Sequence, residues 1–314
     1  QLEIFDLADN ALSGSIPETF GKLRSLEQFM LYNNSLSGAI PDGMFECRNI
    51  TRVNIAHNRL SGSLLPLCGT ARLLSFDATN NSFDGRIPAQ LGRSSSLQRV
   101  RLGSNMLSGP IPPSLGGIAT LTLLDVSSNE LTGGIPAALA QCRQLSLIVL
   151  SHSRLSGAVP GWLGSLPQLG ELALSNNEFT GAIPVQLSNC SNLLKLSLDN
   201  NQINGTVPPE LGSLASLNVL NLAHNQLSGQ IPTTVAKLSS LYELNLSQFT
   251  KLPVRSDPFG YRQAIIVAES AGLEQQQSQW PHPCIARLTP QAGKPEPVPQ
   301  RSGRRGAVAA RWNE

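Results

Sequence analysis

One position of this sequence returns every 24 residues, and it constrains the fold more than any other feature. It is asparagine in nine of ten occurrences and serine in the tenth, and one step is 23 residues long. The surrounding pattern is L-x-x-L-x-L-x-x-N-x-L-x-G-x-I-P-x-x-L-G-x-L, as in 193-LLKLSLDNNQINGTVPPELGSL-214. One such unit cannot bury its apolar side chains alone, so the units must stack into a solenoid. The ten positions are Asn10, Asn34, Asn58, Asn81, Asn105, Asn129, Ser153, Asn177, Asn201 and Asn225.

The pattern is that of a leucine-rich repeat. Its L-x-L segment alternates, so the leucines point into the core and the residues between them face out from a half-exposed strand. Its Gly-x-Ile-Pro step carries a proline through which a helix cannot continue. We therefore expect an α/β solenoid: a right-handed, plant-type leucine-rich repeat superhelix with a parallel concave sheet and a convex side of 3₁₀ and extended segments.

The repeated asparagine follows each predicted strand. There its amide can satisfy backbone groups of neighbouring coils, which buried polar groups require. Aliphatic burial supplies the driving force, at about 1.5–3 kcal/mol for each fully buried side chain. Ser153 is shorter than asparagine and cannot span as far, so we expect a local weakness there.

Residues 1–248 follow the repeat and residues 249–314 do not. We expect ten full repeats and part of an eleventh in the first segment, which opens inside a repeat, without a polar cap, and therefore reads as truncated. The first segment carries 14 Lys and Arg against 16 Asp and Glu, and this mild acidity argues against nucleic acid as a partner. The sequence has no run of 18 apolar residues that would indicate a membrane span.

Residues 249–314 have two interpretations. Their Pro-rich and Arg-rich composition, as in 294-KPEPVPQRSGRRG-306, is typical of a disordered basic extension. However, codons that can encode 272-GLEQQQSQWPHPCIARL-288 can also be read one base further along as L-D-L-S-S-N-N-L-S-G-H-I-P-A-S-L-G-S-L. We interpret this segment as leucine-rich repeat coding sequence translated in a shifted frame.

The sequence has no arrangement of residues that favours catalysis. It contains no G-x-S-x-G elbow, phosphate-binding loop, H-E-x-x-H or kinase motif. His57, His152 and His224 share one repeat position in coils three, seven and ten, so at about 4.8 Å per coil they cannot share a metal. The cysteines lack metal-ligand spacing and are expected to be buried. We predict a chain without enzymatic activity, cofactor or metal.

Six N-x-S/T sequons occur in the repeats. Any one of them can arise by chance in an Asn- and Ser-rich repeat, but together they favour the surface of a secreted glycoprotein. The sequon asparagines are Asn33, Asn49, Asn80, Asn189, Asn204 and Asn245.

The outward strand positions suggest where a ligand would bind. Arg99 and Arg101 are two residues apart on one strand, so both side chains leave the same face, and two guanidinium groups can grip a carboxylate or sulfate. The alternative is a solvated charge pair held by Asp77 or Asp125. The candidate binding residues are Arg99, Arg101, Arg52, Tyr32, Asp77 and Asp125.

Residues 1–248 resemble the ectodomains of plant leucine-rich-repeat receptor-like kinases. Three irregular stretches resemble the GASSHO (SCHENGEN) group in particular: 29-FMLYNNSLSG-38, 64-LLPLCGTARLLSFDATNNSFDG-85 and 160-PGWLGSLPQLGEL-172. The resemblance implies an ectodomain on the extracellular side of the plasma membrane that binds a small secreted, tyrosine-sulfated peptide. It also implies a co-receptor kinase with leucine-rich repeats, a membrane helix and a cytoplasmic Ser/Thr kinase. Arg99 and Arg101 resemble the R-x-R element of related peptide receptors.

The chain departs from this family in lacking the amino-terminal cap, the membrane helix and the kinase, and in its last repeats, which the 249–314 segment replaces. Two other functions are therefore open. One is a secreted binding module similar to polygalacturonase-inhibiting proteins or to a decoy receptor. The other is a truncated product with no activity of its own.

Overall fold

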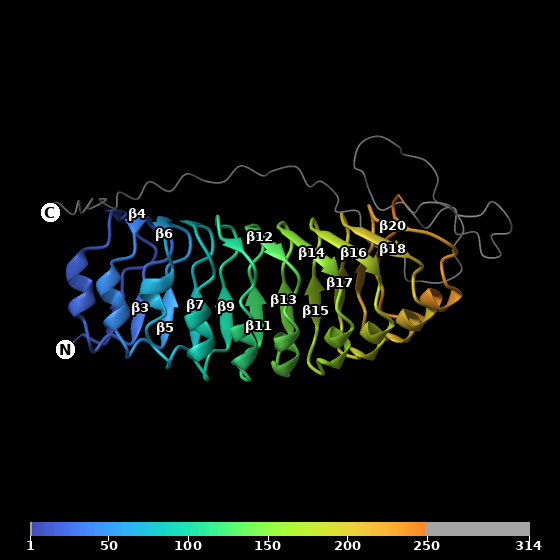
Figure 1. Cartoon of the computed structure of the whole chain (residues 1–314), viewed down its shortest axis with the longest axis horizontal. Helices are drawn as coiled ribbons and strands as arrows, with labels where there is room; N and C mark the ends of the chain where they lie inside the picture. The colour runs from blue at the N-terminus through green and yellow to red at the C-terminus, as the bar shows by residue number, and fades with distance from the viewer. Residues whose placement is uncertain (1, 249–314) are drawn as a thin grey trace, which may run out of the picture.

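The computed structural model describes residues 2–248. Its central element is an eleven-stranded parallel sheet to which each coil contributes one three-residue strand in chain order (Figure 1). The strands are β1 (Ile4–Asp6), β3 (Gln28–Met30), β5 (Arg52–Asn54), β7 (Ser75–Asp77), β9 (Arg99–Arg101), β11 (Leu123–Asp125), β13 (Leu147–Val149), β15 (Glu171–Ala173), β17 (Lys195–Ser197), β19 (Val219–Asn221) and β21 (Glu243–Asn245). The predictions for residues 249–314, disorder and a shifted frame, lie outside the described residues.

A second series of strands follows the Asn position of each coil and forms two smaller parallel sheets. The four-stranded sheet contains β2 (Ser13–Gly14), β4 (Ser35–Ala39), β6 (Arg59–Gly62) and β8 (Ser82–Phe83). The six-stranded sheet contains β10 (Ser108–Gly109), β12 (Glu130–Gly133), β14 (Arg154–Ala158), β16 (Glu178–Ala182), β18 (Gln202–Gly205) and β20 (Gln226–Leu227).

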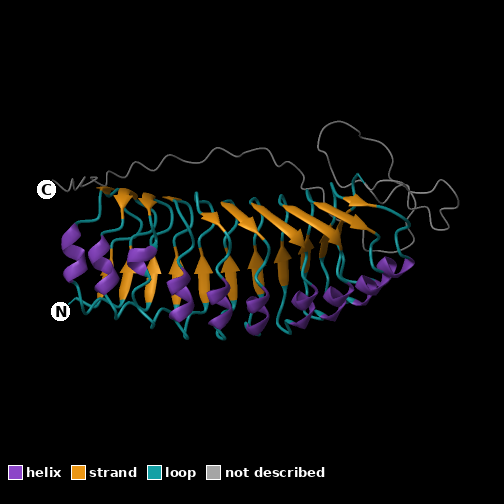
Figure 2. Cartoon of the chain, in the orientation of Figure 1, coloured by secondary structure: helices purple, strands orange, loops and turns teal. Residues whose placement is uncertain are grey.

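A short 3₁₀ helix completes each of the first ten coils, and Figure 2 shows these helices as a row beside the strands. Most begin directly after the proline of the Gly-x-Ile-Pro step, as η1 does after Pro17, because proline has φ near −65° and an extended ψ there. The helices are η1 (Glu18–Lys22), η2 (Asp42–Glu46), η3 (Leu65–Leu67), η4 (Ala89–Arg93), η5 (Pro113–Gly117), η6 (Ala137–Gln141), η7 (Gly161–Ser165), η8 (Val185–Asn189), η9 (Pro209–Ser213) and η10 (Thr233–Lys237). These elements confirm the predicted solenoid.

Neighbouring 3₁₀ helices pack closely because the repeat places glycine in them. A Cβ atom added to Gly116 in η5 would collide with the carbonyl group of Ala138 in η6. Only a residue without a side chain fits at this contact, which accounts for the L-G step of the pattern.

The asparagine positions form the predicted ladder. Asn129 donates from Nδ2 to the carbonyl oxygen of Leu102 in the preceding coil, at 3.0 Å. Its Oδ1 accepts the backbone N–H of Leu107, at 2.9 Å. Each such side chain thereby hydrogen-bonds backbone groups of the preceding coil, which explains why the asparagine recurs once per coil.

Ser153 interrupts this ladder, as expected. Its Oγ is buried and has no hydrogen-bond partner among the described residues. At the neighbouring Asn177, by contrast, Oδ1 accepts the N–H of Leu155 at 3.0 Å and Nδ2 donates to Leu150 at 2.9 Å. The serine leaves this junction without the side-chain bonds that an asparagine makes at the neighbouring coils.

The residue directly before each ladder position has left-handed backbone geometry. His57, for example, has φ of 55°, and His152 and His224 have φ of 59° and 52°. Asn, Asp and His tolerate this conformation better than most residues. The three histidines therefore occupy a turn position, and within the described residues no group of three His, Cys, Asp or Glu side chains could hold a metal ion.

Candidate peptide-binding surface

The open face of the eleven-stranded sheet consists of the first and third residues of each strand. The middle residues, such as Val100 in β9 and Phe76 in β7, are fully buried beneath it. In-register pairing of all eleven strands stacks the outward residues in two rows along the solenoid. We call this surface the sheet face.

Arg99 and Arg101 lie side by side on the sheet face, on either side of buried Val100, and both are exposed as predicted. Arg101 pairs in register with Asp77 of β7 and with Asp125 of β11. Its Nη1 lies 3.6 Å from Asp77 Oδ2. Asp77 also accepts the backbone N–H of Thr79 through Oδ1, at 3.1 Å. The Arg101 charge is therefore partly neutralised.

Asp125 does not pair with either arginine. Its Oδ1 accepts the N–H and the hydroxyl of Ser127, at 3.0 and 2.6 Å. Of the alternative in which Asp77 or Asp125 holds the arginine pair, the structure shows one contact: Asp77 binds Arg101, and Asp125 is occupied within its own coil.

Arg99 keeps its full charge available. Among the residues that the structure describes, its guanidinium group forms no ion pair. Arg52 occupies the same row two strands away, with Ser75 between them. The Arg52 side chain also has no ionic partner in the described part. The fold therefore brings Arg52, Arg99 and Arg101 onto one small area of the sheet face.

Tyr32 does not belong to that area. It lies beyond the end of β3, three coils before β9. The carboxylate of Asp9 raises the pKa of Tyr32, mainly through its charge. A ligand that reaches both Tyr32 and Arg101 would have to extend across several strands.

Sequence reasoning missed a hydrophobic strip beside the arginines. Leu123 and Leu147 are register partners in one row, and Val149 and Ala173 are partners in the other. Leu123 is 9% exposed and Ala173 is 6% exposed, so the strip is a shallow floor. The signal was present, because aliphatic residues replace polar ones at outward positions in 147-LIV-149. Beyond the strip, Lys195 Nζ binds Glu171 Oε1 at 3.1 Å.

The sequon asparagines differ in their surroundings. Asn189 and Asn204 are exposed, whereas Asn49 bonds through both amide atoms: Nδ2 donates to Arg24 O at 2.9 Å, and Oδ1 accepts from Arg72 at 3.0 Å. The amides of Asn33 and Asn80 contact Asp9 and His57 of the preceding coils. Asn245 lies on the sheet face in β21, where its Oδ1 accepts the N–H of Ser247.

The described cysteines Cys47, Cys68, Cys142 and Cys190 are free thiols in the core, where burial raises their pKa. Cys142 Sγ lies 3.4 Å from the carbonyl oxygen of Leu115 in the preceding coil, and Cys190 lies 3.5 Å from that of Leu163. Their equivalent positions serve coil packing.

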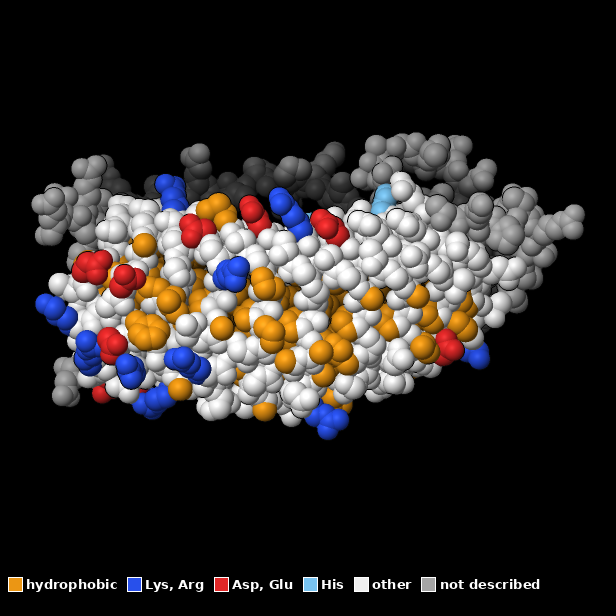
Figure 3. Space-filling model, in the orientation of Figure 1, with side chains coloured by type: hydrophobic (Ala, Val, Ile, Leu, Met, Phe, Trp, Pro, Cys, Tyr) orange, Lys and Arg blue, Asp and Glu red, His pale blue; other side chains and the backbone are white. Residues whose placement is uncertain are grey.

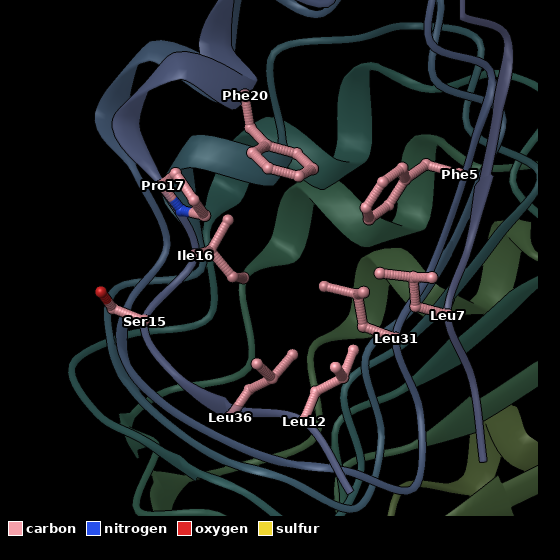
Figure 4. Close-up of a pocket in the computed structure, with 9 residues that line it drawn as sticks. All are labelled: Phe5, Leu7, Leu12, Ser15, Ile16, Pro17, Phe20, Leu31 and Leu36. Carbon is pink, nitrogen blue, oxygen red and sulfur yellow. The ribbon is translucent and has the colours of Figure 1, made fainter. Parts of the chain in front are cut away.

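A small hollow opens in the core of the first two coils. Figure 4 shows the rings of Phe5 and Phe20 beside one another there, and they meet edge to face with centroids 4.9 Å apart. The lining is aliphatic and aromatic apart from Ser15 and offers no convergent polar groups to orient a ligand. The sheet face remains the stronger candidate. No helix of the described part has the length and apolar character needed to cross a membrane.

Known protein families agree with this fold. Two models, both described as leucine rich repeat, match residues 1–60 and 143–203 and residues 96–118, 120–142 and 216–238, which together exceed half of the chain. The chain belongs to the leucine-rich repeat proteins.

Among solved structures, the ectodomain of the Arabidopsis thaliana membrane receptor kinase GASSHO1/SCHENGEN3, in complex with CASPARIAN STRIP INTEGRITY FACTOR 2, is 55% identical with a TM-score of 0.79. The match covers 81% of this chain and 31% of that one. The Arabidopsis receptor kinase HAESA, in complex with the peptide hormone IDA and the co-receptor SERK1, is 39% identical with a TM-score of 0.75, over 78% of this chain and 41% of that one.

A curated relative agrees with these structures. The LRR receptor-like serine/threonine-protein kinase GSO2 of Arabidopsis thaliana is 58% identical over 38 residues. Those residues are 12% of this chain and 3% of GSO2, so the chain spans only a small part of this relative and about a third of the GASSHO1 ectodomain. The predicted resemblance to GASSHO-type receptors is confirmed.

Proposed function

We propose that this chain is a ligand-recognition region of a plant receptor kinase ectodomain and binds a small secreted peptide along the sheet face. The observation that carries the proposal is the Arg99 guanidinium, which is exposed and forms no ion pair within the described residues, beside Arg101 and next to a hydrophobic strip. An anionic peptide group would bind the arginines through charge-assisted hydrogen bonds, and adjacent aliphatic side chains would cover Leu123 and Leu147.

The similar receptors support this assignment. The GASSHO1, HAESA and RGFR1 ectodomains were solved with CASPARIAN STRIP INTEGRITY FACTOR 2, IDA and RGF2 respectively, and HAESA also with the co-receptor SERK1. By analogy we propose a tyrosine-sulfated peptide as ligand, a leucine-rich repeat co-receptor as partner, and a location outside the plasma membrane. Catalysis would belong to a Ser/Thr kinase elsewhere in the full-length receptor and not to these repeats.

Binding of a tyrosine-sulfated CASPARIAN STRIP INTEGRITY FACTOR 2 peptide to the full chain tests this function. Isothermal titration calorimetry should show a loss of affinity of roughly tenfold or more for the double variant Arg99→Ala, Arg101→Ala, because two charge-assisted contacts disappear. The matched control is Arg143→Ala, Arg154→Ala, which removes two exposed arginines away from the sheet face. Unchanged affinity in the first variant, with both proteins folded by circular dichroism, would refute the proposal.

We also propose that residues 249–314 come from a shifted reading frame. The coding DNA tests this directly: a translation shifted by one base should contain further leucine-rich repeats. A shifted translation without them would contradict the interpretation.

A further inference from the structure

Three arginines occupy one repeat position in three successive coils, away from the sheet face. Arg24, Arg48 and Arg72 each lie 14 residues after the ladder asparagine of their coil, in the segments that follow η1, η2 and η3. All three are exposed. Figure 3 shows Lys and Arg side chains gathered over the amino-terminal coils, on the side of the 3₁₀ helices. We call Arg24, Arg48 and Arg72 the arginine column.

The first two arginines of the column already share a carboxylate. Glu46 Oε2 lies 3.6 Å from Arg24 Nη1 and 3.3 Å from Arg48 Nη2. Glu46 is 47% exposed and the two arginines are 59% and 67% exposed, so the whole arrangement is at the surface. Adjacent coils therefore stack closely enough for one carboxylate oxygen to bridge the guanidinium groups of two arginines.

The third arginine has no such carboxylate. Coil three carries Thr70 where coil two carries Glu46, and Thr70 is buried, with its hydroxyl donated to Arg48 O at 2.9 Å. Arg72 Nη1 instead donates to the neutral amide oxygen of Asn49, at 3.0 Å. This bond orients the Arg72 side chain and leaves its charge uncompensated.

Further cations extend the basic surface. Lys22 ends η1 and Arg93 ends η4, and both are exposed. Among the described residues, neither Arg72 nor Arg93 forms an ion pair, and Glu46 is the one acid paired with the column. Five cations thus face solvent across four coils. The exposed Glu18 and Asp42 begin η1 and η2, but of the described acids only Glu46 is paired with the column.

We propose that the arginine column binds an extended acidic polysaccharide, with the carboxylates of successive sugars lying between arginines of successive coils. Such a polymer carries one carboxylate on every sugar, and its row of charges can follow the axis along which the coils stack. Each contact would repeat the geometry that Glu46 makes with Arg24 and Arg48. Arginine suits this role because its planar group bonds carboxylates in a fixed fork.

Two other polyanions fit less well. An extended acidic peptide points successive side chains to opposite faces, so only every second carboxylate would meet the column. Nucleic acid binding depends on a broad basic surface, whereas residues 1–248 contain more acidic than basic residues. The column also lies outside the strands of the sheet face, so this site is independent of the proposed peptide site.

Binding of the full chain to polygalacturonic acid tests the proposal, with the fully methyl-esterified polymer as an uncharged probe of the same sugar. We expect binding to the acid form alone, with an affinity that falls as salt rises. The variant Arg48→Glu, Arg72→Glu should lose roughly tenfold or more in affinity. The control Arg143→Glu, Arg154→Glu makes the same charge change. Arg143 lies 14 residues after Asn129, which is the column position of coil six, but that position is uncharged in the coils on either side.

A gain of affinity provides the sharpest readout. Glu46→Gln removes the carboxylate that competes for Arg24 and Arg48, so affinity for polygalacturonic acid should rise roughly twofold to fivefold. A misfolded protein would not show this gain. The proposal is overturned if the wild-type chain binds the esterified polymer equally well, if the control variant loses as much affinity as the column variant, or if oligothymidylate binds more tightly. Peptide affinity should stay unchanged in the column variant, which separates this test from that of the sheet face.

Discussion

Arg101 and Asp77 are register partners on neighbouring strands, with Arg101 Nη1 3.6 Å from Asp77 Oδ2, while the adjacent Arg99 faces Ser75. One arginine of the pair is thus partly neutralised within the protein and the other remains available. Asp77 is 18% exposed and Arg101 is 47% exposed, so the aspartate is the more buried partner of the pair. This asymmetry makes Arg99 the stronger anion contact.

Asp77→Asn should increase the affinity for an anionic peptide roughly twofold to fivefold, because it removes the charge that competes for Arg101. The asparagine oxygen can still accept the N–H of Thr79, so the melting temperature should barely change. Calorimetric titration with the sulfated peptide checks the affinity. Asp125→Asn is the matched control, since Asp125 pairs with Ser127 and not with arginine. An equal gain in the control would mean that the loss of any negative charge on the sheet face, and not the loss of the Asp77–Arg101 ion pair, raises the affinity.

Ser153→Asn should stabilise the solenoid by about 1–2 kcal/mol. The asparagine Oδ1 can accept the backbone N–H of Leu131, and the substitution removes a buried hydroxyl that has no hydrogen-bond partner in the described part. The equivalent bonds are made by Asn129 to Leu107 and by Asn177 to Leu155. Urea unfolding measures the change. The reciprocal variant Asn129→Ser should lose stability of at least the same size. A destabilised Ser153→Asn protein would show that the coil spacing there cannot accommodate the longer side chain.

Glycan occupancy should follow the freedom of each sequon. Asn189 and Asn204 are exposed, and their side chains make no hydrogen bond within the described part, so we expect both to carry sugar. Asn49 is bonded through both amide atoms and should stay bare. Peptide mapping by mass spectrometry after expression in plant cells decides this. Sugar on Asn49 would contradict the prediction and would also cover Arg72 of the arginine column.

Alkaline pH should destabilise the solenoid through its buried thiols. Burial raises the pKa of Cys190 to about 11, whereas the pKa of a cysteine in an unfolded chain is about 8.5. The thiol therefore contributes full stability below about pH 8.5, and this contribution declines as the pH rises toward the folded pKa, because the unfolded chain loses its proton first. Urea midpoints at increasing pH should fall over this window.

The variant Cys190→Ala isolates this thiol. It should be less stable overall, because its packing is reduced, but its urea midpoint should fall less steeply with pH than that of the wild-type chain. The same slope in both proteins would assign the alkaline loss to other groups. Burial also raises the pKa of Cys47, Cys68 and Cys142, so part of the slope should remain.

The repeat alone predicted most of the architecture. The leucine alternation and the proline before each 3₁₀ helix lie within single coils, and the asparagine recurs at one position of every coil, so the repeat pattern was sufficient to place them. The left-handed turn before the ladder was not predicted, although His57, Asn80 and Asn176 at that position are residues that tolerate it. The arginine column was not predicted, although Arg24, Arg48 and Arg72 each lie 14 residues after a ladder asparagine; only the structure shows that Glu46 pairs with two of them and not with the third.

The sequence by itself determined the coil, because period and alternation decide which side chains can be buried. It also determined that Arg99 and Arg101 share a face. Only the tertiary structure decided which charges are used within the fold. Asp77 and Asp125 are both one coil from Arg101, and the choice between them depends on Ser127, which competes for Asp125 at 2.6 Å. Such competition is settled by side-chain contacts between and within coils, which a repeat pattern does not encode.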